Sequence, residues 1–245
     1  MFQIFKYKRF LGLMMLVISV AGCTNSGDSS IQNMDETEEQ ENQKTATFLA
    51  LGDSYTIGEA VEEELRWPVQ LADSARENGF NIQEPRIIAT TGWTTSELLE
   101  GIESANIEGE KYDFVSLLIG VNNQFRGQDI EIYRKEFEEL LDMAISFADS
   151  NARRVFVLSI PDYGVTPFGK RNAEKIAEEL DQYNNIASRF CTEKNVTYFY
   201  ITDISREAAD NPDLIASDNL HPSGKMYTRW VELIYPWFEA KLNGL

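Results

Sequence analysis

The 245-residue chain contains an apolar run that ends in a glycine turn, Thr47-Phe48-Leu49-Ala50-Leu51-Gly52-Asp53-Ser54. Positions 48–51 are all apolar, with no alternation of polar and apolar residues. Such a run predicts a strand that is buried on both faces, as in a parallel sheet covered by helices. Gly52 ends this strand and places Asp53 and Ser54 at its carboxyl end.

Similar apolar runs recur along the chain, at 86–89, 114–119, 155–160 and 196–201. Helical patterns lie between and after them, at 67–78, 95–103, 130–149, 172–193 and 223–242. In the segment 130–149 the apolar residues recur at spacings of three and four, which gives that helix one apolar face for packing on a sheet. Strands and helices in alternation predict an α/β fold, a three-layer α/β/α sandwich with a five-stranded parallel sheet over residues 45–245.

The composition excludes several functional classes. The chain is 43% hydrophobic and 25% charged, which is enough for one sizeable core. It has 22 Lys and Arg against 40 Asp and Glu, a net charge of −18 that argues against nucleic acid as a partner and mildly against strongly anionic substrates. His221 is the only histidine, and Cys23 and Cys191 are the only cysteines, so we expect no zinc site.

The N-terminus has the pattern of an export signal. Basic residues between positions 6 and 9 precede an apolar run at 10–20, which is short for a membrane span. The sequence Val20-Ala21-Gly22-Cys23 resembles the bacterial lipoprotein signal, which implies removal of residues 1–22 and lipid attachment to Cys23. We therefore expect an exported protein held at the cell membrane or outer membrane. A plain cleaved signal or an uncleaved N-terminal anchor is the alternative.

Residues 23–44 are rich in Ser, Asn, Gln, Asp and Glu and contain almost no apolar side chains. Such a segment cannot bury enough surface to fold, so it is expected to be an acidic, flexible tether. Lipidation of Cys23 would leave Cys191 without an intrachain partner. We therefore expect Cys191 to be a buried or free thiol in the helix at 172–193.

The polar residues that follow the strands are the candidates for chemistry, because parallel α/β sheets bind ligands at the carboxyl ends of their strands. Ser54 is in the position of a nucleophile, and Gly92 could offer an open N–H to a ligand oxygen. The carboxamide of Asn122 could donate to a developing oxyanion. Asp218, three residues before His221, could orient that histidine as a general base.

Each of these residues has an ordinary explanation as a turn or cap residue. Together, however, they supply every role of an acyl-transfer site in one chain. The segments Gly52-Asp53-Ser54, Gly92, Gly120-Val121-Asn122 and Asp218-Asn219-Leu220-His221 resemble the signature of the SGNH, or GDSL, hydrolase superfamily.

The resemblance implies a flavodoxin-like fold and a metal-free serine esterase. Ser54, His221 and Asp218 match the triad, and Ser54, Gly92 and Asn122 match the oxyanion hole. The resemblance also implies that no cofactor is needed. The family often has Asp where this chain has Asn123, which puts the local hydrogen bonding and the substrate subclass in doubt. Tyr55 in place of Leu is a common variation, and neither change removes a triad role.

The substrate class implied is a carboxylic ester with a short to medium acyl chain, such as an O-acetylated carbohydrate or a lysophospholipid. Candidate substrate-binding residues flank the motifs or lie in the loop after the fourth strand: Asp53, Tyr55, Trp93, Asn123, Phe125, Tyr163 and Phe168. Two alternatives stay open. An acyltransferase would use the same acyl-enzyme, and a catalytically silent lipoprotein would only bind a ligand. A monomer is expected.

Overall fold

The structure, a computed structural model, describes residues 44–245, which fall within one compact unit. The expected signal segment 1–22, Cys23 and nearly all of the tether lie outside the described residues. No helix between Lys44 and Leu245 is long and apolar enough to cross a membrane.

Five parallel strands form the sheet: β1 (Phe48–Gly52), β2 (Arg86–Ala89), β3 (Phe114–Leu118), β4 (Val155–Leu158) and β5 (Thr197–Phe199). Their order is β2-β1-β3-β4-β5, with Phe48 opposite Phe114 and Gly52 opposite Leu118 in the β1–β3 ladder. This is a doubly wound order whose direction reverses between β1 and β3. The predicted α/β/α fold with a five-stranded parallel sheet is confirmed.

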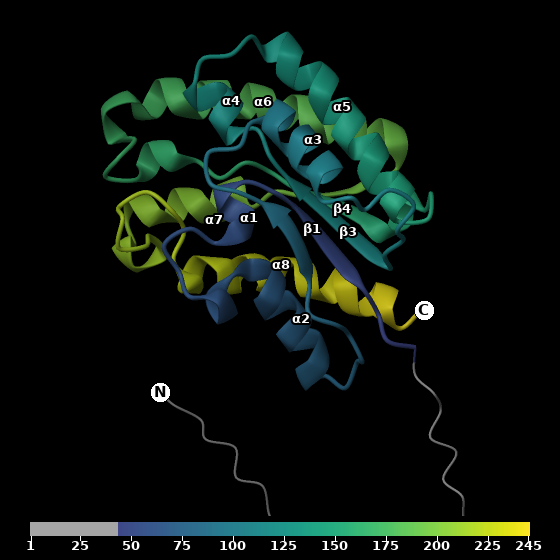
Figure 1. Ribbon diagram of the computed structural model, residues 1–245. Helices are drawn as coiled ribbons and strands as arrows, with labels where there is room; N and C mark the ends of the chain where they lie inside the picture. Colours follow the sequence, from purple (N-terminus) through teal and green to yellow (C-terminus); the bar gives the residue numbers. More distant parts are fainter. Residues whose placement is uncertain (1–43) are drawn as a thin grey trace, which may run out of the picture. The chain divides into compact units, whose positions relative to one another are not determined.

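The helices form the two outer layers (Figure 1). The helices α3 (Thr95–Ser104), α5 (Ile130–Phe147) and α6 (Ala173–Lys194) cover one face, and α2 (Trp67–Glu77) and α8 (Gly224–Leu242) cover the other. Right-handed crossovers explain this division, because the chain moves from β1 to β2 in one direction and from β2 towards β5 in the opposite direction.

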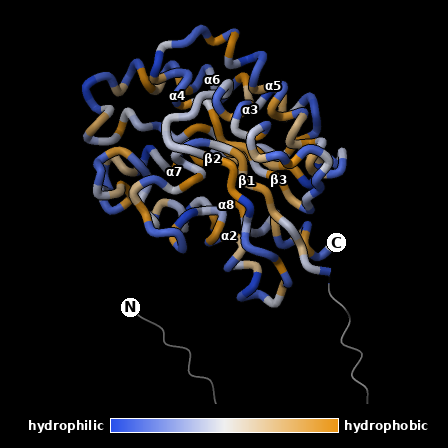
Figure 2. The backbone as a smooth tube through the Cα atoms, in the orientation of Figure 1, coloured by the Kyte–Doolittle hydropathy of each residue, from blue (hydrophilic) through white to orange (hydrophobic). Residues whose placement is uncertain are grey.

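Aromatic side chains fill the core between the sheet and α8. Phe48, Phe114 and Phe156 project from β1, β3 and β4, and the ring of Phe238 in α8 lies 4.4 Å from that of Phe114 and 5.8 Å from that of Phe48. Figure 2 shows β1 and β3 as a hydrophobic centre within helices that are hydrophilic on the outside. The three inner strands β1, β3 and β4 are buried on both faces, as the sequence predicts. The same expectation is wrong for β2 and β5, which are partly exposed because they form the edges of the sheet.

Three short helices follow directly on strands and were not predicted: α1 (Ser54–Ile57), α4 (Val121–Phe125) and α7 (Thr202–Arg206). They are too short to show helical periodicity. The strand expected at 155–160 ends at Leu158, because the N–H and C=O of Ile160 bond to the side chain of Asn184 instead of to a strand. Short 3-10 helices lie in the connections, at Glu63–Leu65, Ala152–Arg154, Tyr163–Val165, Lys170–Asn172, Glu207–Ala209 and Pro212–Leu214.

Candidate active site

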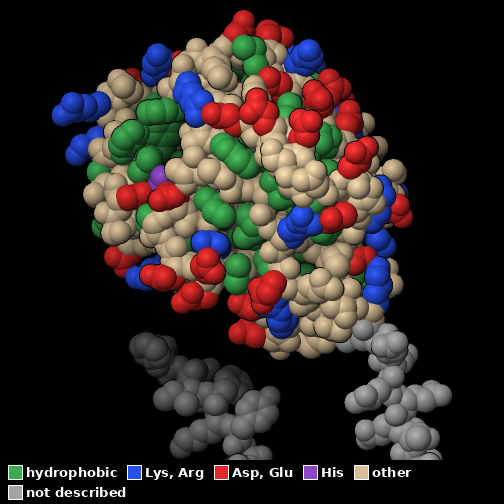
Figure 3. All heavy atoms as spheres, viewed as in Figure 1, with side chains coloured by type: hydrophobic (Ala, Val, Ile, Leu, Met, Phe, Trp, Pro, Cys, Tyr) green, Lys and Arg blue, Asp and Glu red, His purple; other side chains and the backbone are tan. Residues whose placement is uncertain are grey.

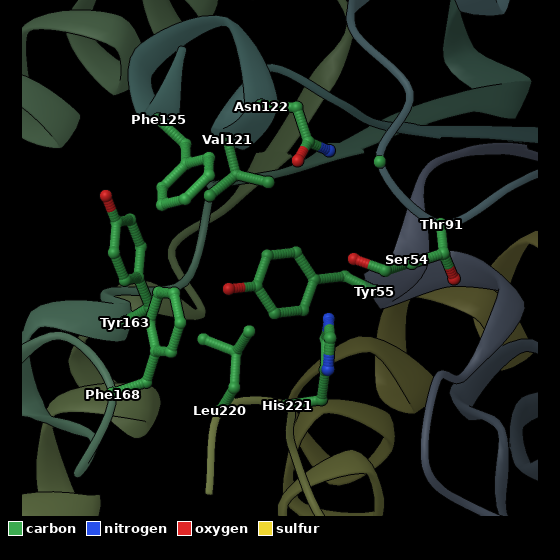
Figure 4. A pocket seen from close by; sticks show the side chains of 11 residues that line it. Ser54, Tyr55, Thr91, Val121, Asn122, Phe125, Tyr163, Phe168, Leu220 and His221 are labelled. Carbon is green, nitrogen blue, oxygen red and sulfur yellow. The ribbon is translucent and has the colours of Figure 1, made fainter. Parts of the chain in front are cut away.

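A cavity of about 160 Å³ opens at the carboxyl ends of the central strands, where the strand order reverses. Four of the five residues expected in the triad and the oxyanion hole line it: Ser54, Gly92, Asn122 and His221. The rest of its wall is mostly apolar and is made by Tyr55, Thr91, Val121, Phe125, Tyr163, Phe168 and Leu220 (Figure 4). The structure therefore brings together residues from four separate motifs.

The turn after β1 presents Ser54 to this cavity. A Cβ at Gly52 would lie 2.2 Å from Thr56 Oγ1 and 2.6 Å from the carbonyl oxygen of Leu118, so only glycine allows α1 and β3 to approach so closely. Asp53 then caps α1, accepting the N–H of Tyr55 at 3.0 Å. Ser54 is the first residue of the helix, with its side chain at the cavity (Figure 4).

Asp53 itself is fully buried beneath that turn. Burial raises the pKa of its carboxyl to about 7, against the hydrogen bonds from backbone N–H groups, which lower the pKa. One carboxyl oxygen binds the Tyr55 N–H, and the other has no hydrogen-bond partner among residues 44–245. Asp53 therefore supports the turn that carries Ser54 and does not line the cavity.

Asp218 and His221 form a bonded pair. His221 Nδ1 lies 2.5 Å from Asp218 Oδ2, and Asp218 Oδ1 accepts the backbone N–H groups of Leu220 and His221, both at 2.9 Å. Partial burial acts to raise the pKa of Asp218, but the hydrogen bonds from His221 and Leu220 outweigh burial and lower it. Asp218 is thus held as a carboxylate that fixes the ring of His221.

The loop that carries this pair is closed on itself. Ile215 and Pro222 form an antiparallel bridge, and the Ala216 N–H donates to the His221 carbonyl at 2.8 Å. The imidazole also meets the buried ring of Tyr55 edge to face, with centroids 5.7 Å apart. These contacts fix where the imidazole stands.

Ser54 and His221 face each other across the cavity floor. Figure 4 shows the outer ring nitrogen of His221 directed towards the Ser54 side chain. Within the described residues no hydrogen bond joins Ser54 Oγ to His221, and catalytic pairs often close such a bond only in the reacting complex.

Three N–H donors can converge on an oxygen atom beside Ser54. The backbone N–H groups of Ser54 and Gly92 meet no protein acceptor in the part of the chain that the structure describes. Gly92 has φ +90°, a left-handed conformation that favours glycine. Asn122 Nδ2 uses one N–H on the Trp93 carbonyl at 2.9 Å and keeps a second N–H for a ligand.

Arg126 holds the turn of one of these donors, Gly92, in place, a role that the sequence did not suggest. Its Nη2 donates to the Gly92 carbonyl at 2.5 Å, and its Nη1 lies 3.2 Å from Glu97 Oε1. Glu97 in turn belongs to the capping box of α3, in which its Oε2 accepts the backbone N–H of Thr94 at 2.7 Å. These contacts link the Gly92 turn to α3 and to the end of α4. In the sequence, the one signal for Arg126 is its position four residues after Asn122.

Some predicted substrate-binding residues lie outside the cavity. The ring of Trp93 packs against Gly101 of α3, and Asn123 is fully buried with Thr95 and Gln128. With Asp53 they form the support behind the cavity, so direct contact of these three side chains with substrate is not supported. Thr91, Val121 and Leu220 line the cavity and were not singled out, although each is next to a motif residue.

Tyr55, Phe125, Tyr163 and Phe168 do line the cavity, as expected for substrate-binding residues. The rings of Phe125, Tyr163 and Phe168 lie about 6 Å apart, at 5.9–6.3 Å, on the side of the cavity opposite Ser54 (Figure 4). The Tyr163 hydroxyl donates to Gln124 Oε1 at 2.9 Å, and Figure 4 shows it pointing away from Ser54. In the region 44–245, no group of three or more His, Cys, Asp or Glu side chains could hold a metal ion.

A family model described as GDSL-like lipase/acylhydrolase matches residues 50–229, a range that includes all the motif residues. No curated protein sequence matches the chain significantly.

Solved structures share the fold. TesA is 15% identical, with a TM-score of 0.63 over 80% of this chain and 99% of that one. The psychrotrophic esterase EstA from Pseudoalteromonas sp., in a structure inhibited by monoethylphosphonate, is 18% identical with a TM-score of 0.60 over 81% and 99%. A lipase/acylhydrolase from Enterococcus faecalis is 20% identical with a TM-score of 0.61 over 80% and 96%.

Proposed function

Because the chain belongs to the GDSL-like lipase/acylhydrolase family and is a carboxylic-ester hydrolase, we propose that it cleaves its esters at Ser54 through an acyl-enzyme. The observation that carries the proposal is the convergence of Ser54, Gly92, Asn122 and His221 on one cavity, with Asp218 bonded behind His221. These residues come from four different loops, and together they supply a nucleophile, a base and an oxyanion hole.

The reaction follows from this arrangement. His221 accepts the proton of Ser54, whose Oγ attacks the ester carbonyl, while Asp218 stabilises the imidazolium that forms. The N–H groups of Ser54, Gly92 and Asn122 stabilise the negative oxygen of the tetrahedral intermediate. Collapse expels the alcohol, which takes the proton from His221. A water molecule, deprotonated by His221, then releases the acid and restores Ser54.

The cavity favours a short to medium acyl chain. Its volume of about 160 Å³ is below the roughly 300–1,000 Å³ of ordinary small-molecule pockets, and its wall is mainly apolar. Phe125, Phe168 and Leu220 would contact the acyl chain, and the alcohol would leave towards solvent. Acetylated carbohydrates and short-chain lipid esters both meet this requirement.

The proposal is tested by hydrolysis of p-nitrophenyl esters from acetate to palmitate. Ser54→Ala and His221→Ala should each lower kcat/KM by at least about a thousandfold, because the triad acts as a unit. Ser104→Ala, an exposed serine at the end of α3, is the control and should keep full activity. We expect the rate to be highest for the shorter esters.

Other outcomes identify the alternatives. An added alcohol that competes with water for the acyl group would indicate an acyltransferase. An enzyme inert on every ester, in which no organophosphonate labels Ser54, would indicate a ligand-binding protein. Full activity of Ser54→Ala would overturn the proposed nucleophile.

We also propose that Cys23 carries a lipid that anchors the exported protein to the membrane, on the strength of the signal-like sequence before it. Cys23→Ser should shift the protein from the membrane fraction to the soluble fraction and remove the lipid mass. Unchanged fractionation and mass would contradict the anchor.

A further inference from the structure

Two large aromatic side chains are half exposed at the mouth of the cavity. Phe125 is 56% exposed and Phe168 is 53% exposed, and their rings lie 5.9 Å apart. Single exposed apolar side chains are common on protein surfaces and need no explanation. This pair is different, because it is contiguous and both rings also line the cavity that holds Ser54.

Basic side chains stand next to this pair. Lys170 and Arg171 follow Phe168 by two and three residues, and Lys175 lines a hollow together with Phe125 and Phe168. Lys170 and Arg171 are exposed and form no ion pair within residues 44–245, while Lys175 meets Glu179 at 3.6 Å on the surface. We call Phe125, Phe168, Lys170, Arg171 and Lys175 the aromatic–basic rim.

The charge of the rim is opposite to that of the chain as a whole. Lys170 and Arg171 stand in the segment that carries Phe168, whereas Lys175 is paired with Glu179, which lines the same hollow, and the whole chain has a net charge of −18. Figure 3 shows basic side chains beside an apolar patch next to the single histidine, while acidic side chains are spread over much of the same face. Two exposed basic side chains without an ion pair among residues 44–245, Lys170 and Arg171, thus follow closely on Phe168, which lines the cavity.

We propose that the aromatic–basic rim docks the mouth of the active site onto an anionic lipid surface. Aromatic rings partition into the interface between headgroups and acyl chains, and Lys and Arg beside them attract anionic headgroups. At physiological ionic strength charges are screened beyond about 8 Å, so the more distant acidic residues oppose this contact only weakly. The rim therefore fits an anionic bilayer in both polarity and charge.

Docking in this orientation would turn the cavity towards the bilayer. Ester-bearing lipids could then reach Ser54 between Phe125 and Phe168 without crossing bulk water. Docking of the rim does not require the proposed ester hydrolysis, because vesicle binding is measured without any turnover. Failure of docking and failure of catalysis are thus separate results.

The test is co-sedimentation of residues 44–245, which contain the whole described core and the compact unit, with two kinds of vesicle. One is pure phosphatidylcholine and the other an equimolar mixture of phosphatidylcholine and phosphatidylglycerol. We expect binding to the mixture and little to phosphatidylcholine alone. Lys170→Glu with Arg171→Glu should weaken binding at least about tenfold while hydrolysis of soluble p-nitrophenyl acetate is unchanged.

A matched charge reversal is the control. Lys111→Glu with Arg153→Glu makes the same change in net charge on exposed residues that precede β3 and β4, at the opposite end of the sheet. This pair should leave vesicle binding unchanged. Phe125→Ser with Phe168→Ser should weaken it even though every basic residue is kept.

Three results would overturn the proposal. One is equal binding to both kinds of vesicle, and another is no binding to either. The third is an equal loss of binding in the two charge-reversed variants, which would mean that net charge and not the rim attracts the protein.

Discussion

Asp53 is the residue whose charge is most affected by the fold. Its pKa is raised by burial from 3.8 to about 7, so the folded protein holds a proton that the unfolded chain releases. The folded state is therefore destabilised progressively as pH rises from about 4 to about 7, by up to about 4 kcal/mol. Asp53→Asn keeps an acceptor for the Tyr55 N–H without the charge. The new amide NH₂ takes the place of the oxygen that has no partner among residues 44–245, which offsets part of this gain. At pH 8 we expect the variant to be more stable than the wild type by about 1–3 kcal/mol.

Urea unfolding of both proteins at several pH values checks this expectation, since the difference between them removes the contribution of the other titrating groups. The advantage of Asp53→Asn should disappear near pH 4. A difference in stability that does not change with pH would show that Asp53 is ionised throughout.

Arg126 is a second single residue that supports the site, because its side chain binds the Gly92 carbonyl and Glu97. Arg126→Met should lower kcat on a short ester about tenfold, because the Gly92 turn loses its link to Glu97 and α3, with KM within about twofold of the wild type. Arg126→Lys should recover only part of the rate, since an ammonium lacks the planar fork of donors. Steady-state kinetics separates the two constants, and Arg134→Met, which removes an exposed pair on α5, is the control. A rise in KM alone would argue for a substrate-binding role instead.

At the scale of elements, Asn123 joins the start of α3 to α4. Its Nδ2 donates to Thr95 Oγ1 at 2.7 Å and to Gln128 Oε1 at 2.9 Å, and its Oδ1 accepts the Thr95 N–H at 3.1 Å. Asn123→Asp would restore the residue common in the family but could not donate either bond. We expect it to cost about 3 kcal/mol and to lower Tm by roughly 5–10 °C.

Thermal unfolding of Asn123→Asp beside Asn151→Asp tests this. The side chain of Asn151 accepts one hydrogen bond, from the backbone N–H of Arg153, and an Asp side chain can accept it too. The Tm of Asn151→Asp should therefore be nearly that of the wild type. Equal Tm values for Asn123→Asp and the wild type would mean that the two Nδ2 bonds contribute nothing.

The sequence was most informative about the elements that bury one face or both. The apolar runs and the three-and-four spacing located the five strands and the five long helices, with ends displaced by only a few residues. Short α1 and α4 escaped prediction because a helix of four or five residues has no period to detect. The site motifs were predictable because Ser54, Gly92, Asn122 and His221 each follow or precede an element end.

The supporting residues could not be predicted in the same way. Distance along the chain does not separate these residues from the ones that line the cavity, because each is the immediate neighbour of a motif residue: Asp53, Trp93 and Asn123. Which side of a loop faces the cavity depends on contacts distant in sequence, such as Trp93 with Gly101 or Arg126 with Gly92. Those contacts exist only once the helices have packed.

At the scale of the whole molecule, Cys191 offers a probe of unfolding. It has no disulfide partner among residues 44–245 and is 1% exposed in α6, and burial raises the pKa of its thiol to about 12. In residues 44–245 we expect it to resist a thiol reagent in native buffer and to react fully in denaturant, at a rate that follows global unfolding. Fast reaction in native buffer would show that α6 opens locally.

The measurement that bears most directly on the account is the site and rate of phosphonate labelling. A fluorophosphonate should add one phosphonyl group to the chain, and peptide mass spectrometry should place it on Ser54, as in a serine nucleophile activated by its base. His221→Ala should react more slowly by at least about a thousandfold, and Ser54→Ala should not react. A label on another residue, or equal labelling of His221→Ala and the wild type, would contradict a Ser54 nucleophile activated by His221.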